Sequence, residues 1–337
     1  MHERNVNVNE AKAAVASTRR MKADAEGIFE AAHVLTAGGL AAFPTETVYG
    51  LGADATNPTA VAKLYAAKGR PSFNPLIAHV VDIEAAKRVG HFNALALVLA
   101  AKFWPGPLTL VVPSAGVVCD LARAGLDTVG LRVPLHPAAQ RLLSTIGKPV
   151  AAPSANRSGH VSPTAADHVM ADLSGRIDFV LDGGPTALGL ESTIVDCTGE
   201  APRILRAGGV PREKLEQALG REIGQASAHE TSAPTSPGQL ASHYATLAAI
   251  RLNAREVLPG EALLAFGAHL PEGAAQASAS LNLSPRGDLV EAAANLFAHL
   301  RTLDAAGAKT IAVMPIPSEG LGEAINDRLA RAAAPRT

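Results

Sequence analysis

The stretch FPTETVYGLGADA, at residues 43–55, is the part of the sequence that decides the fold. An apolar strand candidate at residues 40–43 leads directly into two threonines, a glutamate and two glycines. The glycines allow a tight turn of the backbone, and Thr45 and Thr47 supply hydroxyl groups beside it. The segment predicts a strand that ends in a polar loop. Taken alone, that loop is equally consistent with a functional site and with an ordinary turn.

Apolar strands and helical segments alternate around this stretch, from about residue 23 to residue 224. Asn57-Pro58 predicts the start of one helix and Gly69 its end, while Pro137 and Gly147 bound another. The mixture predicts α/β architecture, with functional residues at strand ends and in the loops that follow them. The strand candidates lie at residues 40–43, 76–81, 108–112, 128–133, 149–152, 179–182, 192–196 and 203–206.

The composition changes at about residue 227. The stretch SAHETSAPTSP is rich in Ser, Thr, Ala and Pro and has no apolar period, which is typical of a linker that few contacts cross. Strand candidates at residues 262–266 and 310–314 then alternate with helices at 289–303 and 321–333, which predicts a small parallel sheet. We therefore expect four segments: a tail (1–22), a first α/β domain (23–226), a linker (227–247) and a second α/β domain (248–337).

Composition narrows the function classes. The 337 residues carry a formal net charge of -1, so no broad basic field is available to hold nucleic acid, and any RNA contact is expected to be indirect or local. Cys119 and Cys197 lack metal-ligand spacing, which favours a reducing compartment. The N-terminus has no apolar signal region and is expected to be a frayed tail or a short extra helix. No apolar run approaches the roughly 20 residues of a membrane span, so we expect a cytoplasmic protein without membrane contact.

Arg132 is the most informative charged residue, because it interrupts an apolar run at residues 129–134. An arginine in a buried strand is costly unless an anion meets it. From the residues alone, that anion is either an Asp or Glu of the fold or the carboxylate of a ligand.

Two further segments offer groups that suit phosphates. In KGRPSFNPLIAHV (68–80), Lys68 and Arg70 follow a helix and Asn74 follows them, although Lys68 could simply complement the helix C-terminus. His79 lies in an apolar strand, where a structural role is the more common one. APSANRSGHVSPT (152–164) is a loop of hydroxyl and amide residues that either presents backbone N–H groups to phosphate or is a polar surface loop. The sequence contains no GxxxxGK[ST] and no GxGxxG motif.

Seven motifs in order resemble the YrdC-like family over residues 25–220: PTETVYGLG, KGRPSFNPL, FWPGPLTLV, GLRVP, PSAN, ESTIVD and LRAGG. SPGQLASHYAT (236–246), with the small domain after it, resembles the two-domain form of the family, the threonylcarbamoyl-AMP synthases. The resemblance implies a twisted mixed sheet with flanking helices, plus a small C-terminal Rossmann-like α/β domain.

The resemblance also implies an activity. L-Threonine and bicarbonate would form N-carboxythreonine, which attacks the α-phosphate of ATP to give threonylcarbamoyl-AMP and pyrophosphate. Mg²⁺ is expected on the ATP phosphates, with no protein side chain assigned as its ligand. A downstream threonylcarbamoyl-transferase complex would then modify the adenosine beside the anticodon of ANN-decoding tRNA, so that contact with tRNA is indirect.

Site residues follow from the matching motif positions. The residues implied for L-threonine are Thr47, His79, Arg132 and Ser192. Those implied for ATP are Lys68, Arg70, Asn74, Thr128, Ser154, Asn156, Ser162, Arg206 and Tyr244. Tyr244 would fold over the nucleotide as a lid, although it could instead begin the core of the second domain.

Three alternatives stay open at this point. The fold also occurs in carbamoyl-adenylate-forming enzymes of hydrogenase maturation, which normally carry acylphosphatase and zinc-finger modules that this chain lacks. A non-catalytic RNA-binding module is disfavoured by the near-neutral charge and by an aromatic content of only 4%. A nucleotide sensor that uses the second domain is the third.

Overall fold

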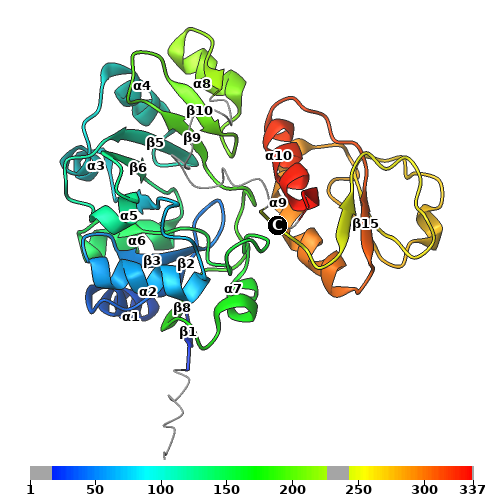
Figure 1. Cartoon of the computed structure of the whole chain (residues 1–337), viewed down its shortest axis with the longest axis horizontal. Coiled ribbons are helices and arrows are strands. Elements are labelled where there is room, and N and C mark those ends of the chain that lie inside the picture. The colour runs from blue at the N-terminus through cyan, green and yellow to red at the C-terminus, as the bar shows by residue number, and fades with distance from the viewer. Residues whose placement is uncertain (1–16, 226–242, 336–337) are drawn as a thin grey trace, which may run out of the picture.

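The computed structural model describes residues 17–225 and 243–335. The first domain is built on an eleven-stranded mixed sheet and the second on a four-stranded parallel sheet, and the two domains lie side by side (Figure 1). The expected combination of a twisted mixed sheet with flanking helices and a small parallel α/β domain is confirmed.

The first sheet has the strand order β1-β8-β2-β3-β7-β4-β6-β5-β9-β10-β11. Its strands are β1 (Arg19–Lys22), β2 (Ala41–Phe43), β3 (Gly50–Asp54), β4 (Ile77–His79), β5 (Leu108–Pro113), β6 (Thr128–Arg132), β7 (Val150–Ala151), β8 (Phe179–Asp182), β9 (Thr193–Asp196), β10 (Arg203–Arg206) and β11 (Gly224–Gln225). The helices of this domain are α1 (Ala25–Thr36), α2 (Pro58–Lys68), α3 (Ile83–Val89), α4 (Ala94–Phe103), α5 (Asp120–Arg123), α6 (Pro137–Ile146), α7 (Ala166–Leu173) and α8 (Arg212–Leu219).

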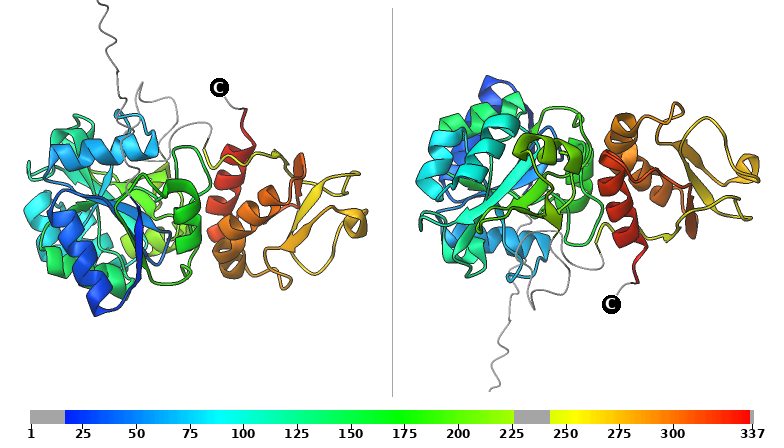
Figure 2. Two further views of the ribbon diagram at one scale, coloured as in Figure 1. Left: turned by 90° about the horizontal axis from the view of Figure 1, so that it is seen from below. Right: turned by 90° about the horizontal axis from the view of Figure 1, so that it is seen from above.

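The second sheet has the order β12-β15-β13-β14. Its elements are β12 (Ala249–Arg251), β13 (Ala262–Ala265), the short 3₁₀ turn η1 (Ala274–Gln276), β14 (Ser280–Asn282), α9 (Leu289–Ala305), β15 (Thr310–Val313) and α10 (Leu321–Ala333). Helices α9 and α10 lie on the side that faces the first domain, and the strands lie beyond them (Figure 2).

Helix boundaries follow the expected capping chemistry. The Asn57 side chain accepts hydrogen bonds from the backbone N–H groups of Thr59 and Ala60, and Pro58 opens α2. Gly69 ends the helix with a φ of 60°, a left-handed conformation that glycine adopts without steric cost. The structure has helices at all four predicted positions, so the predictions of α2, α6, α9 and α10 are confirmed.

The expectation of a frayed tail or an extra helix is wrong for residues 19–22. These residues form β1, which pairs in parallel with β8 at the edge of the large sheet. Arg20 secures the strand, because its Nη2 lies 2.7 Å from Asp182 Oδ2 and its Nη1 lies 2.6 Å from Asp167 Oδ1. The pattern of Arg and Lys concealed the strand because edge strands are commonly charged.

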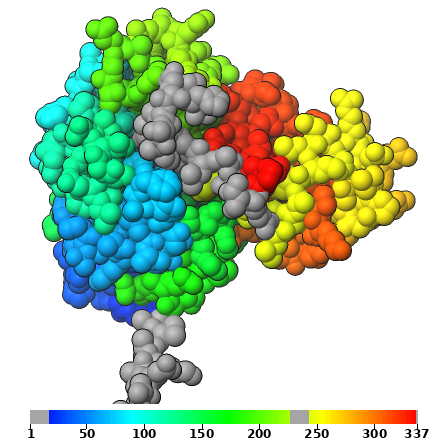
Figure 3. All heavy atoms as spheres, in the orientation of Figure 1, coloured from blue at the N-terminus to red at the C-terminus, as the bar shows by residue number. Residues whose placement is uncertain are grey.

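The two domains share a buried interface, so the expectation that few contacts cross the boundary is wrong. Val48, Val161 and Leu190 of the first domain belong to the same apolar cluster as residues of α9 and α10. Ion pairs join Arg212 with Glu323, Arg301 with Asp172 and Arg328 with Glu191. The space-filling view shows the contact between α10 and the upper part of the first domain (Figure 3). Most of the expected linker lies outside the described residues.

The described helices include none with the length and apolar character needed to cross a bilayer.

The interface provides a first stability prediction at Gly189, whose φ is 72° and whose added Cβ would lie 2.4 Å from the backbone oxygen of Ala293 in α9. We expect Gly189→Ala to lower the free energy of unfolding by about 1–2 kcal/mol for the left-handed backbone, plus roughly 1–3 kcal/mol for overpacking. Gly184→Ala is the matched control, because Gly184 has a φ of 80° and open space around its Cβ position. Urea unfolding of both variants measures the difference, and equal losses would contradict a close approach of the domains at Gly189.

Candidate active site

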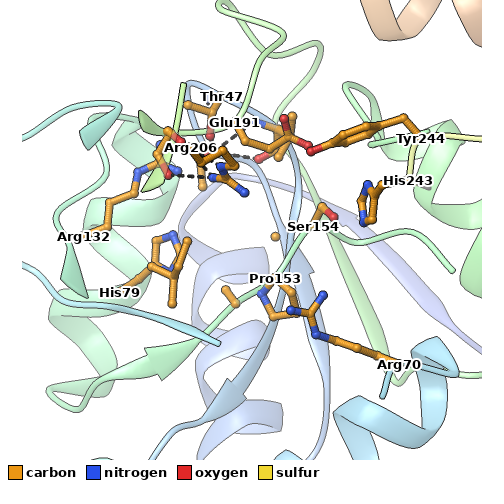
Figure 4. A pocket seen from close by; sticks show the side chains of 16 residues that line it. Thr47, Arg70, His79, Arg132, Pro153, Ser154, Glu191, Arg206, His243 and Tyr244 are labelled. Carbon is orange, nitrogen blue, oxygen red and sulfur yellow. Dashed lines mark hydrogen bonds between the residues drawn. The ribbon is translucent and has the colours of Figure 1, made fainter. Parts of the chain in front are cut away.

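A pocket with an empty volume of about 560 Å³, open space at its mouth included, lies between the ends of several strands of the large sheet and the described end of the predicted linker, at His243 and Tyr244. Figure 4 shows Arg132 and His79 on one side and Arg70, His243 and Tyr244 on the other. The structure brings eight of the predicted site residues to its wall: Thr47, Arg70, His79, Arg132, Ser154, Ser192, Arg206 and Tyr244.

The register between strands β4 and β6 determines where the residues on the first side of the pocket lie. Strands β4 and β6 are parallel neighbours, and His79 pairs with Arg132 in their register. Both residues end their strands, and the carboxyl ends of parallel strands meet at one edge of a sheet. The alternation of the sheet then directs both side chains to the same face.

Arg132 forms a buried ion pair with an acid of the fold, Glu46, which is one of the two anions that its sequence allowed. Its Nη2 lies 2.5 Å from Glu46 Oε1, and its Nε donates to the backbone oxygen of Gly106 at 3.3 Å. Glu46 Oε2 accepts from the N–H of Leu135 at 2.9 Å. Burial opposes the charge of Glu46, but Arg132 outweighs it and lowers the pKa of this carboxyl. Arg132 Nη1 forms no hydrogen bond with any described residue, so it remains available to an anion in the pocket.

His79 is neutral at physiological pH. Burial, reinforced by the charge of Arg132, lowers its pKa to about 3. Its ring packs edge-on against Phe43, and its Nδ1 is buried with no hydrogen-bond partner among the described residues. The histidine therefore contributes shape and a neutral polar atom rather than a positive charge.

Two pairs of hydroxyls line the same region. Thr45 Oγ1 and Thr47 Oγ1 lie 2.7 Å apart, and Ser192 Oγ lies 2.8 Å from Thr109 Oγ1. Arg206 anchors the second pair, because its Nη2 donates to the backbone oxygen of Ser192 at 2.8 Å. Small hydroxyls held this way can donate to or accept from a polar ligand without adding charge.

The pocket is strongly cationic. Arg70, Arg132 and Arg206 line it together with one carboxylate, Glu191. Burial lowers the pKa of Arg70 to about 10, so this guanidinium still carries its charge near neutral pH. Both oxygens of Glu191 are already engaged, one by Ser162 and one by an arginine of the second domain. The excess positive charge suits a ligand with several negative charges.

Five of the residues predicted for ATP do not line this pocket: Lys68, Asn74, Thr128, Asn156 and Ser162. Lys68 is buried and donates from Nζ to the backbone oxygens of Ser154 (2.5 Å) and Asn156, so it holds the loop that carries Ser154. Burial lowers the pKa of this amine well below its usual value. Ser162 Oγ donates to Glu191 at 2.6 Å rather than facing the pocket.

The other three residues of this group also lie behind or beside the wall. Asn156 Nδ2 donates to the backbone oxygens of Arg157 (2.7 Å) and His160 (2.9 Å) within its own loop. The backbone oxygen of Asn74 accepts from Arg70, while its own Oδ1 is buried without a partner among the described residues. Thr128 lines a second, smaller hollow that shares Ile77 with the first pocket. This second hollow continues from the first pocket along the sheet.

Tyr244 belongs to the core of the second domain, one of the two roles that its sequence allowed, and it also lines the pocket. Its side chain is 1% exposed and stacks on Phe297 of α9, with ring centroids 5.4 Å apart, so it belongs to the core of the second domain. The same residue lines the pocket next to His243. Burial lowers the pKa of His243 to about 3, so this second histidine is neutral as well.

Sequence reasoning missed four residues of the site: Glu46, Glu191, His243 and Arg328. The first three stand within motifs that were recognised, next to residues that were chosen. Glu46 lies in PTET, Glu191 in ESTIVD and His243 beside Tyr244. Arg328 gave no signal, since an arginine in an amphipathic helix normally faces water.

The described residues do not form a protein-held metal site. No three His, Cys, Asp or Glu side chains gather closely enough within residues 17–225 and 243–335 to hold an ion. The oxygens of Glu46 and Glu191 are occupied by hydrogen bonds and ion pairs. The expectation of Mg²⁺ therefore depends on ligand phosphates for its ligands.

Comparison with known proteins agrees with this geometry. Residues 33–208 match the family model described as "Telomere recombination" (Sua5/YciO/YrdC), and residues 210–334 match the model of the threonylcarbamoyl-AMP synthase C-terminal domain. The chain is 39% identical to the threonylcarbamoyl-AMP synthase of Bacillus subtilis, over 92% of this chain and 93% of that one. It is 40% identical to the protein of the same name from Pyrococcus abyssi, over 90% and 92%. The chain belongs to the threonylcarbamoyl-AMP synthase family.

The structural comparison covers both domains. The crystal structure of P. abyssi Sua5 complexed with L-threonine superposes with a TM-score of 0.85 at 35% identity, and the match covers 94% of this chain and 97% of that one. Members of the family are enzymes that transfer AMP from ATP and release pyrophosphate.

The ion pair between Arg132 and Glu46 predicts a change in the pH dependence of stability. In the wild type, the depressed pKa of Glu46 stabilises the fold above the unfolded pKa, and this contribution is lost as pH falls. Arg132→Met leaves a buried, unpaired carboxylate, which costs about 3–5 kcal/mol near neutral pH. We expect the pKa of Glu46 to rise above its unfolded value, so that acidification from pH 7.5 to 5 makes up part of the loss.

Urea unfolding at the two pH values tests this reversal. Arg132→Met/Glu46→Gln is the control, because it removes the titrating group and should show no gain on acidification. A single variant that lost further stability at pH 5 would contradict the ion pair.

Proposed function

We propose that the enzyme condenses L-threonine, bicarbonate and ATP to threonylcarbamoyl-AMP and pyrophosphate. The amine of threonine and bicarbonate form a carbamate with loss of water, and a carbamate oxygen attacks the α-phosphorus while pyrophosphate leaves. The observation that supports this most directly is a cationic pocket whose two sides have different chemistry. One side has a partly free guanidinium among small hydroxyls, with Arg206 bonded to Ser192 beside them, and the other has Arg70 and an aromatic ring (Figure 4).

Arg132 is the natural partner of the amino-acid carboxylate. Glu46 holds Nη2, so the guanidinium of this pocket-lining residue is fixed before a ligand arrives. A planar guanidinium pairs with a carboxylate better than an ammonium does. Thr47 and Ser192 then offer hydroxyls to the polar side chain of threonine.

Arg70 and Arg206 serve the phosphates. Adenylyl transfer needs positioning and charge neutralisation more than it needs a strong base. The pocket fits this need, since burial lowers the pKa of both histidines to about 3 and leaves that of Arg70 at about 10, so the histidines are neutral and Arg70 is charged near neutral pH. Fixed cations that need not reorganise stabilise the charge that develops on the leaving pyrophosphate.

Bicarbonate, Mg²⁺ on the ATP phosphates and a downstream threonylcarbamoyl-transferase that modifies tRNA complete this proposal. Magnesium would supply further neutralisation of the phosphate charge. Both cysteines are free thiols, in keeping with a cytoplasmic location.

The carbamoyl-adenylate alternative is separated from this proposal by substrate. Purified protein with ATP, labelled bicarbonate and each amino acid in turn should release pyrophosphate with L-threonine and incorporate the label into an adenylate. Carbamoyl phosphate should not replace threonine and bicarbonate. Pyrophosphate release that depends on carbamoyl phosphate instead would refute the proposal, and ATP binding with no turnover under either condition would favour the sensor.

The two sides of the pocket should separate kinetically. Arg132→Lys keeps the charge beside Glu46 but loses the planar pair, which is worth about 1.5–3 kcal/mol, so the threonine KM should rise at least tenfold. Arg70→Ala should raise the ATP KM and leave the threonine KM nearly unchanged. Steady-state pyrophosphate release measures both constants, and a shift of the same constant in both variants would contradict the assignment of sides.

The double role of Tyr244 predicts a joint effect. Tyr244→Ala removes the ring that stacks on Phe297, which should destabilise the second domain by about 3–5 kcal/mol and also weaken ATP binding. Tyr244→Phe keeps the stacking and loses only the hydroxyl, so its melting temperature should stay close to that of the wild type. Melting curves and ATP titrations on both variants decide the matter. A destabilised Tyr244→Ala protein with unchanged ATP affinity would show that the ring belongs to the core alone.

A further inference from the structure

Arg328 is a fully buried arginine of the second domain that contacts the wall of the pocket without lining it. The side chain belongs to α10 and has a relative exposure of 0%. Its Nε lies 2.9 Å from Glu191 Oε2, and its Nη2 donates to the backbone oxygen of Ala207 at 2.8 Å. Its Nη1 lies 2.5 Å from Asp327 Oδ2. One guanidinium thus uses all three of its nitrogens.

The same guanidinium also packs on the ring of Tyr244, which lines the pocket. Its Cζ lies 5.4 Å from the centre of the Tyr244 ring, within the range of a cation–π contact. Phe297 stacks on the ring at an interplanar angle of 20°. Tyr244 has a φ of 62°, which a residue with a side chain rarely adopts, so its backbone is held by the surrounding contacts rather than by preference.

Glu191 is the residue through which this arrangement reaches the pocket. It lines the pocket, its Oε1 accepts from Ser162, and it directly precedes Ser192, to which Arg206 is bonded. Burial opposes its charge, but Arg328 and Arg206 outweigh that effect and lower its pKa to about 2. Without Arg328, the carboxylate would keep its burial and lose its nearest cation.

We propose that Arg328 is a positioning residue through which the second domain completes the ATP side of the pocket, by fixing the Glu191 carboxylate and the Tyr244 ring against each other. A buried ion pair is poor evidence of added stability, because desolvation of both charges offsets their attraction. A buried ion pair is better suited to fixing the groups around it in one arrangement. Here the arrangement joins a loop before β9, a segment after β10 and Tyr244 at the described end of the predicted linker. The second domain thereby has a part in the ATP site. This inference rests on the proposed function.

The test uses the full chain and four variants: Arg328→Met, Arg328→Lys, Glu191→Gln and Arg328→Met/Glu191→Gln. We expect Arg328→Met to raise the ATP KM and the ATP dissociation constant at least tenfold, and to change the threonine KM less than threefold. Arg328→Lys should recover only part of the loss, since an ammonium cannot reach Glu191 and Ala207 while covering the ring. The double variant should bind ATP at least threefold more tightly than Arg328→Met, because no unpaired charge remains.

Glu323→Gln is the matched control, because Glu323 lies on the same helix and pairs with Arg212 across the same interface but does not line the pocket. It should lower the melting temperature at most and leave both KM values unchanged. If Arg328→Met fails to fold, Arg328→Lys and Glu191→Gln carry the test. ATP affinity within twofold of the wild type in folded Arg328→Met, or in both of those substitutes, would overturn the proposal.

Calorimetric ATP binding separates this proposal from the reaction itself. Wild-type protein that binds ATP but releases no pyrophosphate with L-threonine and bicarbonate would refute the proposed function alone. The effect of Arg328 on ATP binding could still be measured. An equal rise in the ATP and threonine KM values of Arg328→Met would show general loosening of the pocket and would also overturn the proposal.

Discussion

The buried ion pair between Glu191 and Arg328 is the interaction on which the arrangement of both domains around the pocket depends. Neither charge can be left alone in the interior, because an unpaired buried ion costs several kcal/mol. The loop before β9, which carries Glu191, and helix α10, which carries Arg328, must therefore be in contact in the folded protein. The apolar cluster shared by Val48, Leu190 and the second-domain helices stabilises the contact without direction, and the ion pair gives it a defined geometry.

The fold was predictable where local signals agreed with the tertiary structure. Helix α2 combines an Asn–Pro start with a glycine end, and β5 is a mostly apolar run with three β-branched residues. The strands that escaped prediction lack such signals. β3 reads GLGAD and β14 reads SLN, and neither has a β-branched residue or a length that shows alternation. Both are strands because neighbouring strands supply their hydrogen bonds, which is information that a local window does not contain.

The site was predictable as a set of polar residues at strand ends, but not in the directions of its side chains. Arg132 and His79 were both predicted as site residues, and both line the pocket because parallel register places them at one edge of the sheet. Lys68 and Ser162 share the same composition signal and yet face backbone oxygens and Glu191, behind the wall. The sequence also did not show which charged residues pair with each other. Glu46 lies 86 positions from Arg132, and Arg328 lies 137 positions from Glu191.

A common rule relates the charged residues of the site. Each arginine of the pocket wall is fixed by a group that lies away from the ligand: Glu46 holds Arg132, the backbone oxygens of Asn74 and Pro75 hold Arg70, and the backbone oxygen of Ser192 holds Arg206. These contacts set the geometry of the pocket before substrate binds. Preorganised charge is what adenylyl transfer requires, because the enzyme need not reorganise its own dipoles as the charge moves onto pyrophosphate. Arg328 acts in the same way one contact further from the ligand. It fixes the Glu191 carboxylate, which stands beside these cations, and so keeps that carboxylate from competing with the ligand for them.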